Sequence, residues 1–311
     1  MAADTPSGRG PVLRVGLVGK GISGSLTPAM HAAEGRAQGL NLRYDLIDTA
    51  TPEHRGRGLA DIVGDAVRDG FIGLNITHPY KEEVVGVLDT MSAEVRRLGA
   101  ANTLAFRKGS VIGHNTDHMG FVRSFERALR AGPGDRVLLL GAGGAGSAVA
   151  FGLLDLGVKN LVIHDRARGR AVALAQKLLA WDPAWQADVL DDPRDTGKIG
   201  LSGLVDATPM GMPSHPGTAF PPALLRPDMW VMDIVYFPLE TELLTQARAA
   251  GCQVVTGAGM AVWQAVLAFG LFTGKPASAT RMQRVFAGLA RQRGEHAARH
   301  VTADPGNRKP R

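Results

Sequence analysis

Short apolar runs alternate with longer amphipathic stretches along most of this chain. Runs rich in aliphatic and β-branched residues predict strands at 12–18, 42–47, 71–77, 104–106, 137–140, 161–163, 201–207, 230–235 and 252–255. Between them, segments with helical spacing and end signals predict helices at 28–38, 52–68, 80–90, 120–130, 147–156, 167–180, 240–250, 260–272 and 278–291. Strands and helices that alternate in this way predict an α/β fold with parallel sheets.

One glycine-rich turn carries specific chemistry. Gly141-Ala142-Gly143-Gly144-Ala145-Gly146 lies between a predicted strand and a small-residue helix, and Asp165 ends the next strand 24 residues after Gly141 (165 minus 141). In a dinucleotide-binding unit the first glycine permits the turn, the second admits the pyrophosphate and the third allows close helix packing. A glycine-rich structural turn is the alternative, but it requires neither the flanking strands nor the terminal acid. The stretch therefore predicts a dinucleotide site of the Rossmann type.

Composition and charge narrow the class of protein. The 311 residues are 45% hydrophobic and 21% charged, which is ordinary for a soluble α/β protein and enough for two domains. Cys252 is the only cysteine, which excludes an intrachain disulfide and a cysteine-based zinc site. No apolar run approaches the ~18 residues of a membrane span, and the first residues lack a signal-peptide core, so we expect a cytoplasmic protein with no membrane contact.

The net charge of +6 is concentrated at the C-terminus, because residues 291–311 hold six basic and two acidic side chains. The rest of the chain is close to neutral, and no basic stripe interleaved with aromatic residues indicates nucleic-acid binding. We therefore expect no nucleic-acid partner and flexible ends at 1–11 and 292–311. Because the glycine turn lies near residue 140, an independent domain should precede it.

Three polar positions in the first part of the chain stand out. Thr27 precedes Pro28 and is expected to cap the helix 28–38, whereas Ser25 has no comparable structural role. Lys81 begins the predicted helix 80–90, where the helix dipole opposes a cation, so its position favours a functional role. Asp117 precedes the predicted helix 120–130 and either caps it or takes part in chemistry.

Seven motifs in a fixed order resemble those of the shikimate dehydrogenase family over roughly residues 12–290. They are Ser25–His31, Asn75–Lys81, Gly99–Thr103, Asn115–Asp117, Gly141–Gly146, Ala207–Met212 and Met260–Ala265. The chain is most similar to the NAD-dependent quinate/shikimate dehydrogenase branch. Ser25 and Thr27 form Ser-x-Thr where biosynthetic members usually have Ser-x-Ser, and Asp165 stands where NADP-dependent members usually have Asn-Arg-Thr.

The resemblance implies a fold, an activity and a set of site residues. It implies a substrate-binding domain at 12–122, to which the chain returns at 257–290, and a Rossmann domain at 123–256. The implied reaction is oxidation of a ring hydroxyl of quinate or shikimate by hydride transfer to NAD. Lys81 and Asp117 are implied as the proton-transfer pair. The implied substrate ligands are Ser25, Thr27, Thr77, Asn102, Tyr236 and Gln264. The implied cofactor ligands are Gly141, Ala142, Gly143, Gly144, Ala145, Gly146, Asp165, Arg166, Thr208, Met210 and Met260.

Two alternatives remain open within the resemblance. Asp165 favours NAD because a carboxylate binds the ribose diol and repels a 2′-phosphate, but Arg166 occupies the position of a phosphate-binding arginine. An NADP-dependent biosynthetic shikimate dehydrogenase is therefore one alternative. A nucleotide-binding regulator without turnover is the other, although it has no need of Lys81 and Asp117. We expect no metal, a small-molecule substrate, and a monomer or homodimer.

Overall fold

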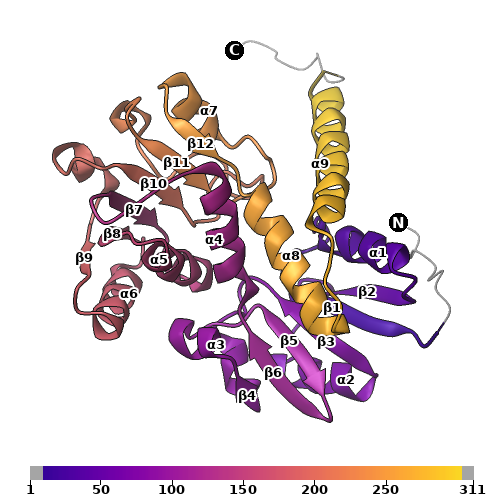
Figure 1. The fold of residues 1–311 in the computed structure, drawn as a ribbon. Coiled ribbons are helices and arrows are strands. Elements are labelled where there is room, and N and C mark those ends of the chain that lie inside the picture. The colour runs from indigo at the N-terminus through magenta and orange to yellow at the C-terminus, as the bar shows by residue number, and fades with distance from the viewer. Residues whose placement is uncertain (1–9, 303–311) are drawn as a thin grey trace.

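Two sheets, each covered by helices, make up the protein (Figure 1). The computed structural model describes residues 10–302. The first sheet is built from residues 13–114 and the second from residues 136–255. The α/β class expected from the sequence is confirmed.

The first sheet is mixed rather than parallel, which corrects the sequence prediction. Its strands have the order β2-β1-β3-β5-β6-β4. Parallel pairing joins β1 to β2 and to β3, whereas β5 is antiparallel to both β3 and β6. Two short strands, β4 and β6, were missed because a hairpin and a two-residue strand depend on pairing partners rather than on periodicity. The strands are β1 (Leu13–Gly19), β2 (Leu42–Asp48), β3 (Phe71–Ile76), β4 (Thr90–Met91), β5 (Thr103–Arg107) and β6 (Ser110–His114).

Helices cover both faces of this sheet. One face packs on α1 (Thr27–Ala37) together with two helices from the end of the chain, and the other packs on α2 (Leu59–Arg68). The helix predicted at 52–68 starts only at Leu59. In place of the helix predicted at 80–90, the structure has a short 3-10 helix, η1 (Glu83–Val87). A further short helix, α3 (Ala93–Leu98), follows β4.

The second sheet is entirely parallel, with the order β12-β11-β10-β7-β8-β9. This is the doubly wound strand order. Successive strands are added in one direction from β7 to β9 and in the opposite direction from β10 to β12, so the switch point lies between β7 and β10. Its strands are β7 (Arg136–Leu140), β8 (Asn160–His164), β9 (Gln186–Val189), β10 (Gly203–Asp206), β11 (Trp230–Asp233) and β12 (Gln253–Val255). Its helices are α5 (Gly144–Asp155), α6 (Arg168–Trp181), η2 (Pro193–Lys198), η3 (Pro222–Leu224) and α7 (Glu242–Ala249).

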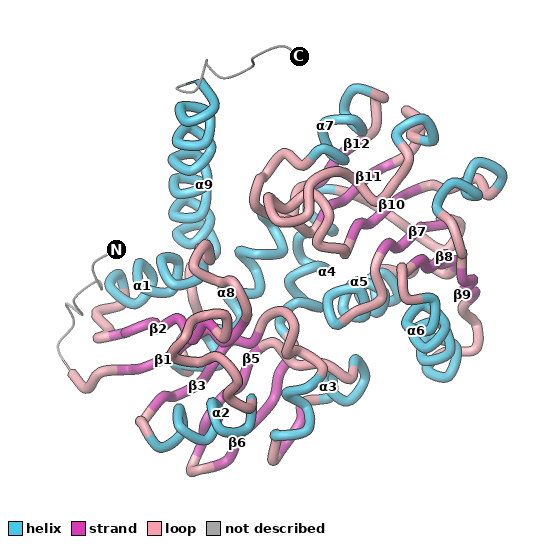
Figure 2. The backbone as a smooth tube through the Cα atoms, turned by 180° about the vertical axis from the view of Figure 1, so that it is seen from behind, coloured by secondary structure: helices cyan, strands magenta, loops and turns pink. Residues whose placement is uncertain are grey.

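Two long helices join the sheets (Figure 2). The chain leaves the first sheet through α4 (Thr116–Ala128) and returns through α8 (Ala258–Thr273), and these two helices pack against each other. The last helix, α9 (Ala279–Thr302), packs on α1 and α8. Residues 292–302 are therefore helical rather than a flexible end, while residues 1–9 and 303–311 lie outside the described residues. Between residues 10 and 302, no helix is both long and apolar enough to cross a membrane.

Candidate functional site

A lysine and an aspartate meet between the two sheets. Lys81 follows β3, and Asp117 lies in the first turn of α4; Lys81 Nζ is 2.6 Å from Asp117 Oδ2. The Lys81 side chain is 18% exposed and that of Asp117 is 9% exposed. An ion pair at this distance is a strong, charge-assisted hydrogen bond. The pair therefore fixes an amine at one point while leaving it accessible.

The structure removes the capping alternative for Asp117. Asn115 caps α4, because its side chain accepts a hydrogen bond of 3.2 Å from the His118 amide. The helix begins at Thr116, four residues earlier than predicted (120 minus 116). The Asp117 carboxylate is consequently available to Lys81, and its place near the helix N-terminus stabilises its charge.

Lys81 does not begin an α-helix, so the dipole argument made from the sequence was wrong. It lies in a turn before η1, in which the Tyr80 amide bonds to the Thr77 carbonyl at 3.0 Å. The Lys81 carbonyl accepts a hydrogen bond of 2.8 Å from the Ala101 amide. Pairing of this turn with the segment before β5, rather than a helix end, sets the position of the lysine.

The glycine turn of the second sheet passes directly beside Lys81. A Cβ atom built on Gly144 would lie 3.2 Å from Lys81 Cβ. Gly141 has a φ of +92°, and a Cβ on Gly146 would lie 2.0 Å from the Gly141 carbonyl oxygen. Both positions therefore require glycine. α5 starts at Gly144 and not at Ser147, so the glycines themselves form the helix N-terminus, whose free amides suit a phosphate.

Asp165 is tied to this turn. Its Oδ2 accepts a hydrogen bond of 2.8 Å from the Ala142 amide, and its Oδ1 accepts one of 2.8 Å from the Ala167 amide. Arg166 is exposed, and within residues 10–302 its side chain enters no hydrogen bond or ion pair. The carboxylate is thus held at the mouth of the glycine turn, and the arginine is free to turn toward a ligand.

Hydroxyl groups from both sheets meet near Asp117. Tyr236, which follows β11, lies beside Ser25, which precedes α1. Burial raises the pKa of the Tyr236 phenol, the Asp117 carboxylate raises it further, and the Ser25 hydroxyl lowers it. The structure therefore brings Ser25, Tyr236 and Asp117 into one region. Thr27 is buried beside Ser25 and is the first residue of α1, not its cap; its amide bonds to Ser25 Oγ at 3.3 Å.

Asn102 is locked in place next to the lysine–aspartate pair. Its Oδ1 accepts a hydrogen bond of 2.7 Å from the Thr116 amide, and its Nδ2 donates to Thr116 Oγ1 at 3.0 Å. The residue is 3% exposed, so one remaining amide hydrogen is what it has to offer a ligand. Thr77 is partly exposed in the same turn as Lys81.

Gln264 of α8 packs against Gly120, which follows Asp117 by three residues on α4. A Cβ on Gly120 of α4 would lie 3.1 Å from the Gln264 backbone nitrogen, so the two helices touch at this glycine. Its side chain donates a hydrogen bond of 3.0 Å to the Ala261 carbonyl. Lys81 and Gln264, which are 183 residues apart in sequence (264 minus 81), thus lie on the same side of the molecule.

A buried polar chain that the sequence analysis missed supports Asn102. The Tyr44 hydroxyl donates to Asn75 Oδ1 at 2.8 Å, Asn75 Nδ2 donates to Thr103 Oγ1 at 3.0 Å, and Thr103 Oγ1 donates to Asn102 Oδ1 at 3.1 Å. Burial, followed by the proximity of Tyr236, raises the pKa of the Tyr44 phenol well above its ordinary value. Tyr44 falls in a strand with alternating polarity, which is the one signal that could have indicated it.

Two further cofactor candidates, Thr208 and Met260, differ in how much they can offer a ligand. Thr208 lies against the glycine turn, since a Cβ on Gly141 would approach its methyl group to 3.2 Å, and its hydroxyl accepts a hydrogen bond of 3.1 Å from the Met210 amide. Met260 is 6% exposed and packs in the core of the second sheet, so its side chain has little surface to offer a ligand.

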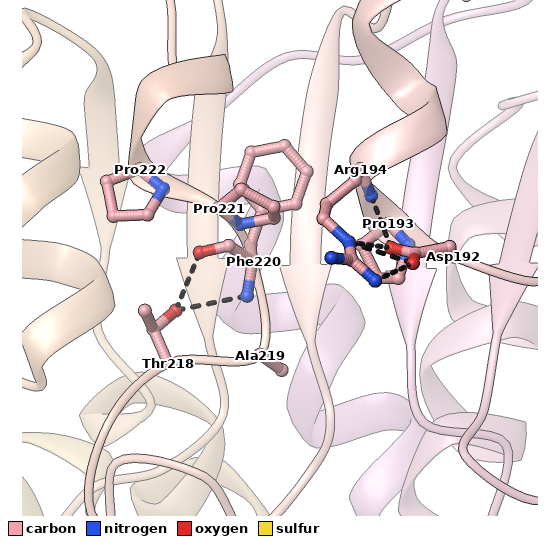
Figure 3. A pocket seen from close by; sticks show the side chains of 8 residues that line it. All are labelled: Asp192, Pro193, Arg194, Thr218, Ala219, Phe220, Pro221 and Pro222. Carbon is pink, nitrogen blue, oxygen red and sulfur yellow. Dashed lines mark hydrogen bonds and ion pairs between the residues drawn. The ribbon is translucent and has the colours of Figure 1, made fainter.

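A hollow elsewhere on the second sheet lacks these features. It measures about 260 Å³ and lies between η2 and η3. Figure 3 shows its charged groups paired with each other: Arg194 Nε donates to Asp192 Oδ2 at 2.8 Å, and Thr218 turns to the Phe220 backbone. With its polar groups satisfied in this way, the hollow is a poor candidate for the reaction. Within residues 10–302, no cluster of three or more His, Cys, Asp or Glu side chains is placed to hold a metal ion.

Two buried carboxyl groups escaped the sequence analysis. Asp206 and Asp233 end the adjacent strands β10 and β11, face each other in register and are each 1% exposed. Burial raises the pKa of Asp206 to about 7, with the Asp233 charge adding to the effect, and burial raises the pKa of Asp233 to about 6. Asp233 Oδ2 accepts a hydrogen bond of 2.7 Å from the Thr241 hydroxyl, whereas Asp206 Oδ2 has no partner among the described residues.

This pair should make stability fall as the pH rises from about 4 to about 7. A carboxyl group with a raised folded-state pKa retains its proton while the unfolded chain releases it, so ionisation favours unfolding across that window. Asp206→Asn removes the contribution of Asp206 to this loss, so the melting temperature of the variant relative to wild type should increase from pH 5 to pH 8. Melting curves across this range test it, with the exposed Asp61→Asn as control. If the difference in melting temperature between Asp206→Asn and wild type were the same at every pH, the raised pKa of Asp206 would be contradicted.

The fold and this site together define a class of protein: a two-domain oxidoreductase that uses a nicotinamide dinucleotide. The glycine turn fits the dinucleotide, because Gly141 and Gly146 leave no space for a side chain. The doubly wound sheet places that turn at its switch point, beside the paired lysine.

The comparisons with known proteins identify the family. Family models match residues 17–104 (shikimate dehydrogenase substrate binding domain) and residues 257–285 (shikimate 5'-dehydrogenase C-terminal domain). A shikimate dehydrogenase (NADP(+)) of Streptomyces avermitilis is 47% identical over 290 residues, covering 92% of this chain and 98% of that protein. A quinate/shikimate dehydrogenase (NAD(+)) of Corynebacterium glutamicum strain R is 46% identical, covering 88% and 98%. The chain belongs to the shikimate dehydrogenase family.

A solved structure supports the same conclusion. Quinate dehydrogenase from Corynebacterium glutamicum in complex with NAD matches with a TM-score of 0.82 and 44% identity, covering 89% of this chain and 99% of that one. The resemblance inferred from the seven motifs is therefore confirmed. The roles of individual residues remain predictions.

Proposed function

We propose that this protein oxidises a ring hydroxyl of quinate or shikimate to the 3-dehydro ketone with NAD as cofactor. The observation that carries the proposal is the ion pair of Lys81 and Asp117, which lies against Gly144 of the dinucleotide turn. Relatives that use NAD on quinate and shikimate support the choice of substrate and cofactor. In this proposal, residues 12–122 and 257–290 form the substrate domain, and residues 123–256 form the cofactor domain.

The proposed reaction needs a proton carrier and a fixed substrate. When bound, NAD accepts the hydride from the ring carbon. Lys81 Nζ, in its amine form, takes the hydroxyl proton as the hydride leaves and returns it in the reverse direction. Asp117 holds that nitrogen at 2.6 Å, which fixes its direction toward the ring. This arrangement supplies orientation as well as proton transfer.

The proposed substrate ligands lie around that pair. Ser25, Thr27 and Tyr236 would bind the ring carboxylate through their hydroxyl groups, while Thr77, Asn102 and Gln264 would bind ring hydroxyls. Asn102 suits this role because its hydrogen bonds to Thr116 fix the side chain before substrate arrives. A site built from fixed polar groups rejects analogues that lack a hydroxyl, since the missing group leaves a buried donor unpaired.

Two observations favour an NADP-dependent shikimate dehydrogenase as the second candidate. Arg166 is exposed and free of protein partners within the described residues, and the relative from Streptomyces avermitilis is named for NADP. Asp165 beside the same turn argues for NAD. The regulator alternative does not account for a lysine and an aspartate paired at the turn.

Initial rates with quinate and with shikimate, each with NAD and with NADP, test the proposal. We expect turnover of at least one acid with NAD, and much lower kcat/KM with NADP. Turnover with NADP alone would favour the biosynthetic candidate. Absence of turnover in all four combinations, with dinucleotide binding intact by calorimetry, would favour the regulator.

A further inference from the structure

The proposed carboxylate ligands are neutral hydroxyl groups, although the substrate carries a negative charge. Lys81 is already neutralised by Asp117. Arg293 brings a further positive charge to this region, and that charge lowers the pKa of the Tyr236 phenol, against the larger effect of burial. Arg293 belongs to α9, which in Figure 1 extends away from the first sheet beside α1.

Arg293 contacts the immediate neighbours of two proposed carboxylate ligands. Its Nη1 donates a hydrogen bond to the carbonyl oxygen of Gly24, which precedes Ser25. Its guanidinium carbon lies 5.5 Å from the centre of the Phe237 ring, which follows Tyr236. The side chain therefore connects a loop of the first sheet with a loop of the second.

α9 is placed for this contact by two further interactions. Near its start, Arg281 Nη1 lies 2.6 Å from Oε2 of Glu34, a buried carboxylate on α1. Seven residues before Arg293 on the same helix face, the Phe286 ring packs edge-on against the Tyr236 ring at 6.0 Å. Phe286 and Arg293 thus hold consecutive residues of the same loop.

Among the side chains that the structure describes, none cancels the charge of Arg293. Among the described side chains, no carboxylate lies within ion-pair distance of its guanidinium, and its partners are a carbonyl oxygen and an aromatic ring. An unpaired guanidinium that is only partly exposed attracts an anion more strongly than one in bulk water. The anion that the adjacent hydroxyl groups would receive is a ring carboxylate.

We infer that Arg293 is a positioning residue for the carboxylate pocket: it fastens the loop of Gly24 and Ser25 to that of Tyr236 and Phe237, and it supplies positive charge that selects anionic ring substrates. The inference rests on the proposed function, which places the carboxylate at Ser25, Thr27 and Tyr236. Arg293 acts through these residues and does not take part in proton transfer.

The test compares a charged ligand with a neutral one. Shikimate and its methyl ester differ in the charge of one group, and both are measured with wild type, Arg293→Gln, Arg293→Lys and the exposed control Arg291→Gln. We expect Arg293→Gln to raise KM and the calorimetric Kd for shikimate about tenfold. kcat should change by less than about twofold, because the proton carrier is untouched. The methyl ester should bind Arg293→Gln and wild type equally, and Arg293→Lys should retain most of the shikimate affinity.

Two results would overturn the inference. If Arg293→Gln weakened shikimate and its ester to the same extent, the arginine would serve the fold alone. If it weakened neither, the contact with Gly24 would be without consequence for binding. Direct binding also separates this inference from the proposed function. A wild-type protein that binds shikimate without oxidising it contradicts the function, while the Arg293 comparison still decides the inference by Kd.

Discussion

Lys81→Ala is expected to lower kcat by about 10²–10⁴-fold, because that is the usual contribution of a positioned general acid or base. The NAD affinity should barely change. Alanine keeps the Cβ atom that lies against Gly144, so the surface of the glycine turn is retained. Stopped-flow kinetics of NADH formation, with NAD binding by calorimetry, measure both quantities. A variant with more than about a tenth of wild-type turnover would exclude Lys81 as the proton carrier.

The control must separate lost chemistry from a damaged fold. Removing Lys81 leaves Asp117, which is 9% exposed, without its counter-ion, and an unpaired buried charge destabilises a protein. Lys81→Met with Asp117→Asn removes both charges while preserving volume, and it should be equally inactive yet fold like wild type. Lys177→Met is the control, because the exposed Lys177 donates to the Leu98 carbonyl at 2.8 Å and, among the described residues, forms no ion pair. It should keep near-normal turnover.

The second domain could be predicted from sequence because its signals are local. Buried parallel strands are continuous apolar runs, and the glycine turn imposes its spacing within a few residues. The strands 137–140 and 161–163 are contained in β7 and β8, and Gly141 and Gly146 prove sterically necessary. The segments 181–200 and 208–229 went without a predicted element, and they contain β9, η2 and η3.

The first domain was harder to predict because its segments depend on tertiary partners. The segment 80–90 has helical spacing, yet its end is extended and is fixed by a hydrogen bond of 2.7 Å from the Val111 amide to Asp89 Oδ2. Pairing of β5 with β6 likewise decides a hairpin that periodicity does not show. Local propensity was overridden in both places by long-range pairing.

The site shows the same division. Ordered motifs indicated Lys81 and Asp117, but the roles of their neighbours were less visible. Asn115 took the capping role considered for Asp117, since it places its side chain on the His118 amide. Tyr44 and Arg293 reach the site only through folding, which brings Arg293 to Gly24 from 269 residues away. Such long-range contacts leave no spacing pattern in one sequence.

The cofactor preference gives the second large effect. Wild type should prefer NAD over NADP in kcat/KM by well over tenfold, because a 2′-phosphate would lie beside the Asp165 carboxylate. Two like unit charges ~4 Å apart repel by roughly 4 kcal/mol at an effective dielectric constant near 20, before screening by salt. Steady-state kinetics with both dinucleotides at several salt concentrations measure the preference. Added salt should narrow it.

Asp165→Asn should reduce this preference chiefly by improving NADP, because Arg166 is already present and unpaired within the described residues. NAD should lose some activity as well. Asparagine has an NH2 group in place of one carboxylate oxygen, and this group cannot accept a hydrogen bond. Either the Ala142 amide or the Ala167 amide therefore loses its present acceptor. Adding Arg166→Ala should abolish the gain with NADP and leave NAD nearly unchanged, which assigns the gain to the arginine. If wild type uses NADP as well as NAD, the guanidinium outweighs the carboxylate, and the NADP-dependent biosynthetic function becomes the better proposal.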